Sequence, residues 1–214
     1  MKTNERFLVT ISRELGSGGR TVGQLLADRL GVKFYDKYLL QRLVKEFDLD
    51  EKAIEKLKGT KQGWWSEFCN KLTRTAGSDP YRYSLDSAED EATPDALYMA
   101  ETRILGDIAA EESCVVAGRA GFYVLRSHPN MLRVCLRASA EHRVHRVMDR
   151  QGLTEAEAAE TIRKVDEMRE NYVKHYTGAS RYDVRNYDLV LNMDTLTEED
   201  AVEIIMAYIE KSGK

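Results

Sequence analysis

The feature that most constrains this chain is a glycine-rich segment that follows an apolar run near its beginning. Residues 7–12 are mostly apolar or β-branched, glycines then fill three of four positions, and apolar residues recur at helical spacing from Val22 to Leu30. This order predicts a strand, a loop and a helix. Such a loop presents backbone N–H groups at a helix N-terminus, where the helix dipole favours an anion. The segment therefore predicts a phosphate site, the glycine loop, formed by Gly16, Ser17, Gly18, Gly19, Arg20 and Thr21.

The glycine loop departs from the standard phosphate-binding pattern. That pattern reads G-x-x-x-x-G-K-[ST], with the lysine on the outer phosphates and the hydroxyl on magnesium. When Gly19, Arg20 and Thr21 are placed on its G-K-T, Glu14 takes the place of the first glycine and Arg20 that of the lysine. Arginine keeps the charge and binds phosphate through a planar fork, so phosphate binding is expected to survive the exchange better than efficient transfer. The alternative is a glycine-rich turn that binds nothing.

Length and composition favour one α/β domain with room for a small inserted subdomain. The chain has 214 residues, 43% of them hydrophobic and 32% charged, and a formal net charge of −4. This mild acidity argues weakly against general nucleic-acid binding, which relies on clustered basic charge. No apolar run approaches the ~20 residues of a membrane span, and residues 1–6 do not resemble a signal peptide. Three widely spaced cysteines are interpreted as reduced residues of a cytoplasmic protein.

The remaining pattern alternates strands with helices. Strands are expected at 32–36, 113–119, 131–136 and 187–192, and helices at 37–47, 94–112, 139–151, after the Thr154 capping box and after Thr197. Between 58 and 93 the pattern weakens. The tryptophans at 64 and 65 are interpreted there as the packed face of a small helical insert, in preference to a base-stacking platform. Five strands alternating with helices predict a mostly parallel, doubly wound sheet with helices on both faces.

Ligands of such sheets bind at the carboxyl ends of the strands. Those ends supply the glycine loop, Asp36 and Arg119, and the neighbouring helices bring Arg42 and the basic residues of 163–185. Several arginines on one rim suit phosphoryl transfer, which needs mainly positioning and neutralisation of charge. The arginines at 143, 146 and 150 are interpreted mostly as a solvated helix face.

Taken together, residues 11–20, 34–37, 115–120, 166–169, 176–178 and 186–189 resemble the cytidylate kinase-like family, relatives of bacterial cytidylate kinase among the nucleoside monophosphate kinases. The resemblance implies a P-loop NTPase-type fold that uses ATP and Mg²⁺, and small-molecule nucleotide substrates without nucleic-acid or membrane partners. It also implies a core at 1–57 and 94–214, an acceptor-binding helical insert at about 58–93 and a lid at about 150–185. The oligomeric state is left open.

The resemblance also implies roles for individual residues. Arg20 and the loop amides would hold the donor phosphates, and the Thr21 hydroxyl would bind Mg²⁺. The acceptor would be held by Asp36, Arg42 and Arg119. Transferring charge would be neutralised by Arg20, Arg163 and Arg169. The aspartate that the family places after the equivalent of Arg119 is Ala120 in this chain.

Three hypotheses follow for function. The chain is a phosphotransferase acting on a nucleoside monophosphate similar to CMP or dCMP, a kinase of another small metabolite, or a nucleotide-binding module without turnover. The lid is expected to respond to ligand, because the like charges of Arg163, Lys164, Arg169 and Lys174 are interpreted as unpaired in the empty state.

Overall fold

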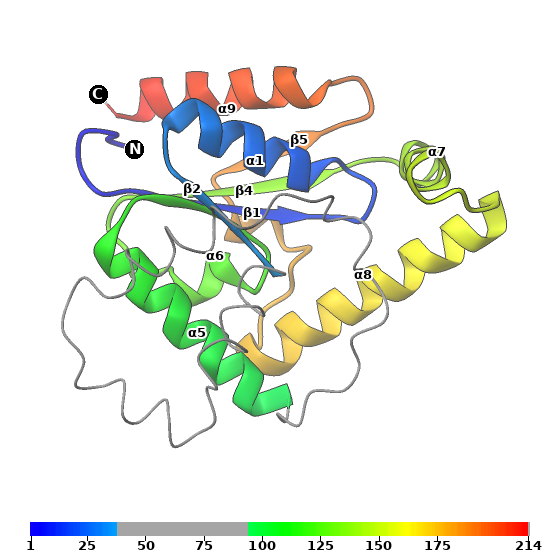
Figure 1. Ribbon diagram of the computed structural model, residues 1–214, viewed down its shortest axis with the longest axis horizontal. Coiled ribbons are helices and arrows are strands. Elements are labelled where there is room, and N and C mark those ends of the chain that lie inside the picture. Colours follow the sequence, from blue (N-terminus) through cyan, green and yellow to red (C-terminus); the bar gives the residue numbers. More distant parts are fainter. Residues whose placement is uncertain (38–93, 214) are drawn as a thin grey trace, which may run out of the picture. The chain divides into compact units, whose positions relative to one another are not determined.

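The computed structural model describes residues 1–37 and 94–213 (Figure 1). The chain divides into a main unit, residues 1–37 and 112–214, and a second unit, residues 38–111. The described part of the second unit is helix α5 (Pro94–Glu111), which confirms the helix expected at 94–112. The expected helix at 37–47 with Arg42, the helical insert and both tryptophans lie outside the described residues.

The main unit is built on a five-stranded parallel sheet, as predicted. Its strands have the order β2-β3-β1-β4-β5. They are β1 (Leu8–Arg13), β2 (Lys33–Asp36), β3 (Cys114–Ala117), β4 (Met131–Arg137) and β5 (Leu189–Asn192). In the parallel register Ile11 lies opposite Ala117, and Arg13 lies opposite Leu136. The carboxyl ends of the central strands therefore meet at one edge of the sheet.

The helices of the main unit follow the predicted order. They are α1 (Gly19–Leu30), α6 (Gly121–Val124), α7 (Ala140–Gln151), α8 (Glu155–Thr177) and α9 (Glu198–Ser212), with a 3₁₀ turn η2 (Val184–Asn186) before β5. Thr154 and Thr197 form capping boxes that open α8 and α9, which confirms these expected starts. The two elements that were not predicted, α6 and η2, are too short to show a helical period.

Helices cover both faces of the sheet. Figure 1 shows α1 and α9 over one face and α6 on the other. Val22 and Leu26 of α1 and Ile205 of α9 are completely buried against Val9 and Ile11 of β1. Burying a side chain of this size contributes about 1.5–3 kcal/mol. Because β1 is covered on both faces, its first four residues, 8–11, are buried and apolar or β-branched. This packing fixes the end of β1, where the glycine loop begins.

The described residues also bear on the sequence-based exclusions. No helix among them is long and apolar enough to cross a membrane. The thiols of Cys114 and Cys135 are free, and burial raises the pKa of both, that of Cys135 to about 11. Residues 1–37 and 94–213 contain no group of three or more His, Cys, Asp or Glu side chains placed to hold a metal ion.

Candidate functional site

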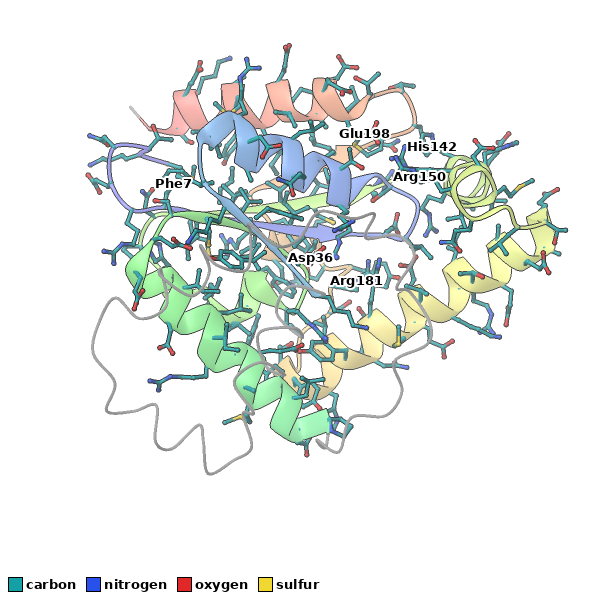
Figure 2. The ribbon with its side chains drawn as sticks, in the orientation of Figure 1. Phe7, Asp36, His142, Arg150, Arg181 and Glu198 are labelled. Atoms are coloured by element: carbon teal, nitrogen blue, oxygen red, sulfur yellow. The ribbon has the colours of Figure 1, made fainter. Side chains whose placement is uncertain are left out.

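Three predicted parts of the site lie at the carboxyl ends of neighbouring strands. Strand β1 leads into the glycine loop, β2 ends at Asp36, and β3 leads into Gly118 and Arg119. These strands are adjacent and parallel, so their ends share the edge where open α/β sheets bind ligands. Figure 2 shows Asp36 in this region together with Arg181, which follows α8.

The backbone of the glycine loop leaves donors available at the start of α1. Gly16 and Gly18 have φ values of 87° and 78°, in the left-handed region that suits glycine, and Gly18 is the N-cap residue without a side-chain cap. Helices α7, α8 and α9 instead begin with caps from Ser139, Thr154 and Thr197. The first backbone N–H groups of α1 are therefore suited to an anion.

Two of the predicted site residues form an ion pair with each other. Arg20 Nε donates to Asp36 Oδ2 at 2.7 Å, and the carboxylate is only 6% exposed. The pair joins the second residue of α1 to the last residue of β2. Arg20 thus binds a carboxylate at the sheet edge, and its contact with the outer phosphates stays a prediction.

A group of arginines surrounds the end of β1. Burial, together with the charges of Arg169, Arg181 and Arg119, lowers the pKa of Arg13 to about 9, whereas Asp36 acts in the opposite direction. The carbonyl oxygen of Arg13 accepts hydrogen bonds from Arg169 Nη1 at 3.2 Å and from Arg181 Nη2 at 2.6 Å. We call Arg13, Arg119, Arg169 and Arg181 the arginine cluster. Like charges gathered in a partly desolvated place favour binding of a polyanion.

Asp166 of α8 connects the arginine cluster to Leu15, the residue before the glycine loop. Its Oδ1 accepts from the backbone N–H of Leu15 at 3.1 Å and from Arg181 Nη1 at 3.3 Å. Its Oδ2 accepts from Arg143 Nη1 at 2.5 Å. We call these four residues the Asp166 clasp. Asp166 is 7% exposed and Arg181 is 6% exposed. Arg169 Nη1 also lies 3.8 Å from Asp166 Oδ1, so three arginines share one buried carboxylate.

Arg119 follows β3 in a strained turn. Gly118, Arg119 and Ala120 have φ values of 83°, 52° and 50°, so three consecutive residues are left-handed. For a residue with a side chain this conformation costs about 1–2 kcal/mol. The Arg119 guanidinium lies 5.2 Å from the ring centroid of Tyr172 on α8. The methyl group of Ala120 is buried with Phe122 and so packs as an apolar side chain.

Some basic residues of α8 pair with acids on the same helix, whereas Arg169 contacts the end of β1. Arg163 is 61% exposed and donates to Glu160 at 2.8 and 2.9 Å and to Glu167 at 3.1 Å, and Lys164 lies 3.3 Å from Glu160. The hydrogen bonds from Arg163 lower the pKa of Glu160 to about 2. The interpretation of these charges as unpaired is therefore wrong, because helical spacing brings an acid beside them. Arg169, in contrast, reaches the end of β1.

The interpretation of α7 as a solvated face is wrong for two of its arginines. Arg143 belongs to the Asp166 clasp and is 14% exposed. Arg146 forms an ion pair with Glu198 of α9, whereas Arg150 is 3.9 Å from the same carboxylate and more exposed. Figure 2 shows Glu198 at the start of α9 and Arg150 on α7. These two arginines are therefore partly buried, because each pairs with an acidic residue that is distant in the sequence.

Sequence reasoning singled out neither Arg13 nor Asp166 as a site residue. Arg13 is the last residue of the first strand. Since ligands bind at the carboxyl ends of strands, this position could have identified it as a site residue. Asp166 lies in the middle of a charged helix, and no local pattern distinguishes it from Glu167 beside it. Arg42, which was expected to hold the acceptor together with Arg119, lies outside the described residues.

Comparison with known proteins gives a consistent match over most of the chain. Residues 8–195 match the model of the cytidylate kinase-like family. The cytidylate kinase of Sulfolobus acidocaldarius is 24% identical over 207 residues, which cover 96% of this chain and 95% of that protein. The matched region includes the glycine loop, Asp36, Arg119 and α8.

Solved structures are similar in fold. A protein from Eubacterium ventriosum has a TM-score of 0.70 and 23% identity, over 96% of this chain and 99% of its own. A gluconokinase from Sinorhizobium meliloti has a TM-score of 0.52 and 16% identity, over 100% and 95% of the two chains. These likenesses agree with the predicted P-loop type of five-stranded parallel sheet.

Proposed function

Because the chain belongs to the cytidylate kinase-like family, we propose that it transfers the γ-phosphate of ATP to a nucleoside monophosphate similar to CMP or dCMP. The observation that carries this proposal is the arginine cluster beside the uncapped start of α1. Phosphoryl transfer needs charge neutralisation and alignment of two phosphates, and little covalent chemistry from the protein. Arginines and helix-terminal N–H groups supply both needs.

The donor side of the proposed site is the glycine loop, residues 16–21. Its backbone amides and Arg20 would hold the ATP phosphates. The described residues lack an acidic metal cluster, so Mg²⁺ would be held chiefly by the nucleotide, with the Thr21 hydroxyl in the first turn of α1 as a protein ligand. Bound there, Mg²⁺ neutralises charge on the phosphates.

The acceptor side would use Asp36, Arg42 and Arg119. Asp36 is held by Arg20, which gives the carboxylate a fixed position between the donor and acceptor parts. Arg119 is braced by Tyr172 of α8, so a phosphate bound by Arg119 would be coupled to the lid. Of the two proposed lid arginines, Arg169 already reaches the end of β1, and Arg163 would contribute after exchanging its partners Glu160 and Glu167.

One observation favours a second candidate, a kinase of another small metabolite. The position that holds an aspartate in the resembling family is Ala120, whose methyl group is buried with Phe122. A carboxylate that would select the acceptor base is therefore replaced by an apolar side chain. Binding of nucleotide without turnover is the third possibility that the experiment must separate.

The proposal is tested by incubating the full chain with radiolabelled ATP, Mg²⁺ and separate acceptors: CMP, dCMP, UMP, AMP and phosphate-free hydroxylated metabolites. We expect label on CMP or dCMP. The variant Arg119→Ala should raise the acceptor KM about 10-fold, since a charged hydrogen bond is lost, and leave the Kd for ATP unchanged. Arg137→Ala, at the exposed end of β4, is the matched control. Label on a hydroxylated metabolite alone would favour the second candidate, and saturable ATP binding without transfer would favour the third.

A further inference from the structure

The start of α1 permits a second placement of the phosphate-loop pattern. Gly18 is the N-cap and Gly19 the first helical residue, so Gly18 takes the place of the last loop glycine in G-x-x-x-x-G-K-[ST]. Gly19 then stands at the lysine position, Arg20 at the Ser/Thr position, and Arg13 at the first glycine. In this placement one cationic side chain is missing at residue 19 and one is gained at residue 13.

The geometry shows why the two changes occur together. A Cβ atom built on Gly19 would lie 2.5 Å from Cβ and 2.8 Å from Cγ of Arg13. The stem of Arg13 therefore fills the space into which a side chain at residue 19 would begin. A lysine at 19 and an arginine at 13 exclude each other.

The head of Arg13 also lies against a glycine. A Cβ atom built on Gly118 would lie 3.2 Å from Cζ of Arg13 and would overlap its Nη1 atom. The side chain thus runs from the end of β1, across the first residue of α1, to the turn that carries Arg119. Both places that it crosses lack a side chain.

The guanidinium of Arg13 has donor capacity to spare. Arg119, Arg169 and Arg181 are near enough to lower its pKa, and Asp36 is engaged by Arg20. Within residues 1–37 and 94–213, no oxygen accepts a hydrogen bond from the Arg13 side chain. A guanidinium carries five N–H donors, and phosphate oxygens match their planar arrangement.

We propose that Arg13 replaces the missing loop lysine and binds the terminal phosphates of the donor nucleotide, its side chain reaching them from the end of β1 across Gly19. This inference rests on the proposed function for the identity of the donor. The ligand chemistry that it requires is a polyphosphate chain at the start of α1. Arg13 would contact the phosphates directly. Its charge and its position in the chain can therefore be tested with separate variants.

The test exchanges the two positions. Binding of Mg²⁺-ATP and of inorganic tripolyphosphate is measured by calorimetry for the full chain and for Arg13→Gly, Gly19→Lys and the double variant. Arg13→Gly should weaken binding of both probes about 10- to 100-fold, as expected for lost charged hydrogen bonds. Gly19→Lys alone should lower the Tm, because its Cβ meets the Arg13 stem. The double variant puts glycine back at the first position and lysine at the lysine position, with Arg20 still at the Ser/Thr position, and should recover most of the lost affinity.

Two further variants separate charge from structure. Arg13→Gln keeps most of the stem and removes the charge, so it tests binding even if Arg13→Gly does not fold. Arg137→Gly makes the same deletion at the end of the neighbouring strand β4, where the side chain is exposed, and should leave both affinities unchanged. An unchanged affinity in Arg13→Gln, or a double variant that binds no better than Arg13→Gly, overturns the inference.

The two probes also separate this inference from the proposed function. If the unaltered chain binds tripolyphosphate but not ATP, the proposed function fails, and the Arg13 variants still decide the inference on tripolyphosphate. If ATP binds and the Arg13 variants bind it equally well, the inference fails and the proposed function stands. Binding of neither probe overturns both.

Discussion

The variant Asp166→Asn removes one negative charge from the Asp166 clasp and keeps the shape of the side chain. Asparagine can still accept from the Leu15 N–H, but its amide group would face Arg143 with a donor where the carboxylate had an acceptor. Arg143 and Arg181 are 14% and 6% exposed and would keep their charges in a buried place. We expect a large loss of folding stability.

The loss in free energy of unfolding can be calculated in two ways. The Arg143 hydrogen bond to a charged acceptor, about 1.5–3 kcal/mol, is lost, and the Arg181 bond weakens because Oδ1 becomes neutral, which together gives about 2–4 kcal/mol. Removing one partner of a buried ion pair costs about 3–5 kcal/mol. The expected loss in free energy of unfolding is therefore about 3–5 kcal/mol, a large part of the total of about 5–15 kcal/mol for a domain.

Urea unfolding at equilibrium measures this loss. Glu167→Gln is the matched control, because the neighbouring residue pairs with Arg163 at 59% and 61% exposure, and such a pair contributes about 1 kcal/mol or less. A change below about 1 kcal/mol in Asp166→Asn would refute the reasoning, since it would mean that the clasp is as weak as a surface ion pair. Added tripolyphosphate should stabilise Asp166→Asn more than the unaltered chain, because the substitution increases the excess of positive charge.

Two further predictions concern other parts of the main unit. Thr154→Ala removes the capping box of α8 and should cost about 1 kcal/mol, measured as a lower Tm, and an unchanged Tm would contradict the role of this cap. Burial raises the pKa of Cys135 to about 11, so its rate of alkylation by iodoacetamide should rise with pH only toward that value; a rise already complete near the ordinary thiol pKa of about 8.5 would contradict it.

The sequence was sufficient to predict the strands and the longer helices of the main unit. Apolar runs such as residues 7–12 and the caps at Thr154 and Thr197 are local signals, and each corresponds to an observed start or end. Their alternation then determined the class of sheet. The helix α6 was missed because its four residues form a single turn, which no periodicity can indicate.

The candidate site was harder to predict because its contacts are long-range. Leu15 and Asp166 are separated by 151 positions, and Arg13 meets Arg181 across 168. Arg143 was interpreted as solvated because its partners come from other elements and leave no mark on the local pattern of α7. The glycine loop, in contrast, was visible in the sequence, since its position between strand and helix is itself a local signal.

The bonds between α8 and the end of β1 also determine how often a lid could open. Three hydrogen bonds join lid residues to residues 13–15: Leu15 to Asp166 of α8, and the Arg13 carbonyl to Arg169 of α8 and to Arg181, which follows α8. At about 1 kcal/mol net each, breaking these three bonds costs about 3 kcal/mol, and the Asp166–Arg143 ion pair adds to this cost, so at most about one molecule in a hundred would be open at any moment. A nucleotide that enters only the open form would then show an apparent Kd at least about a hundred times its intrinsic value.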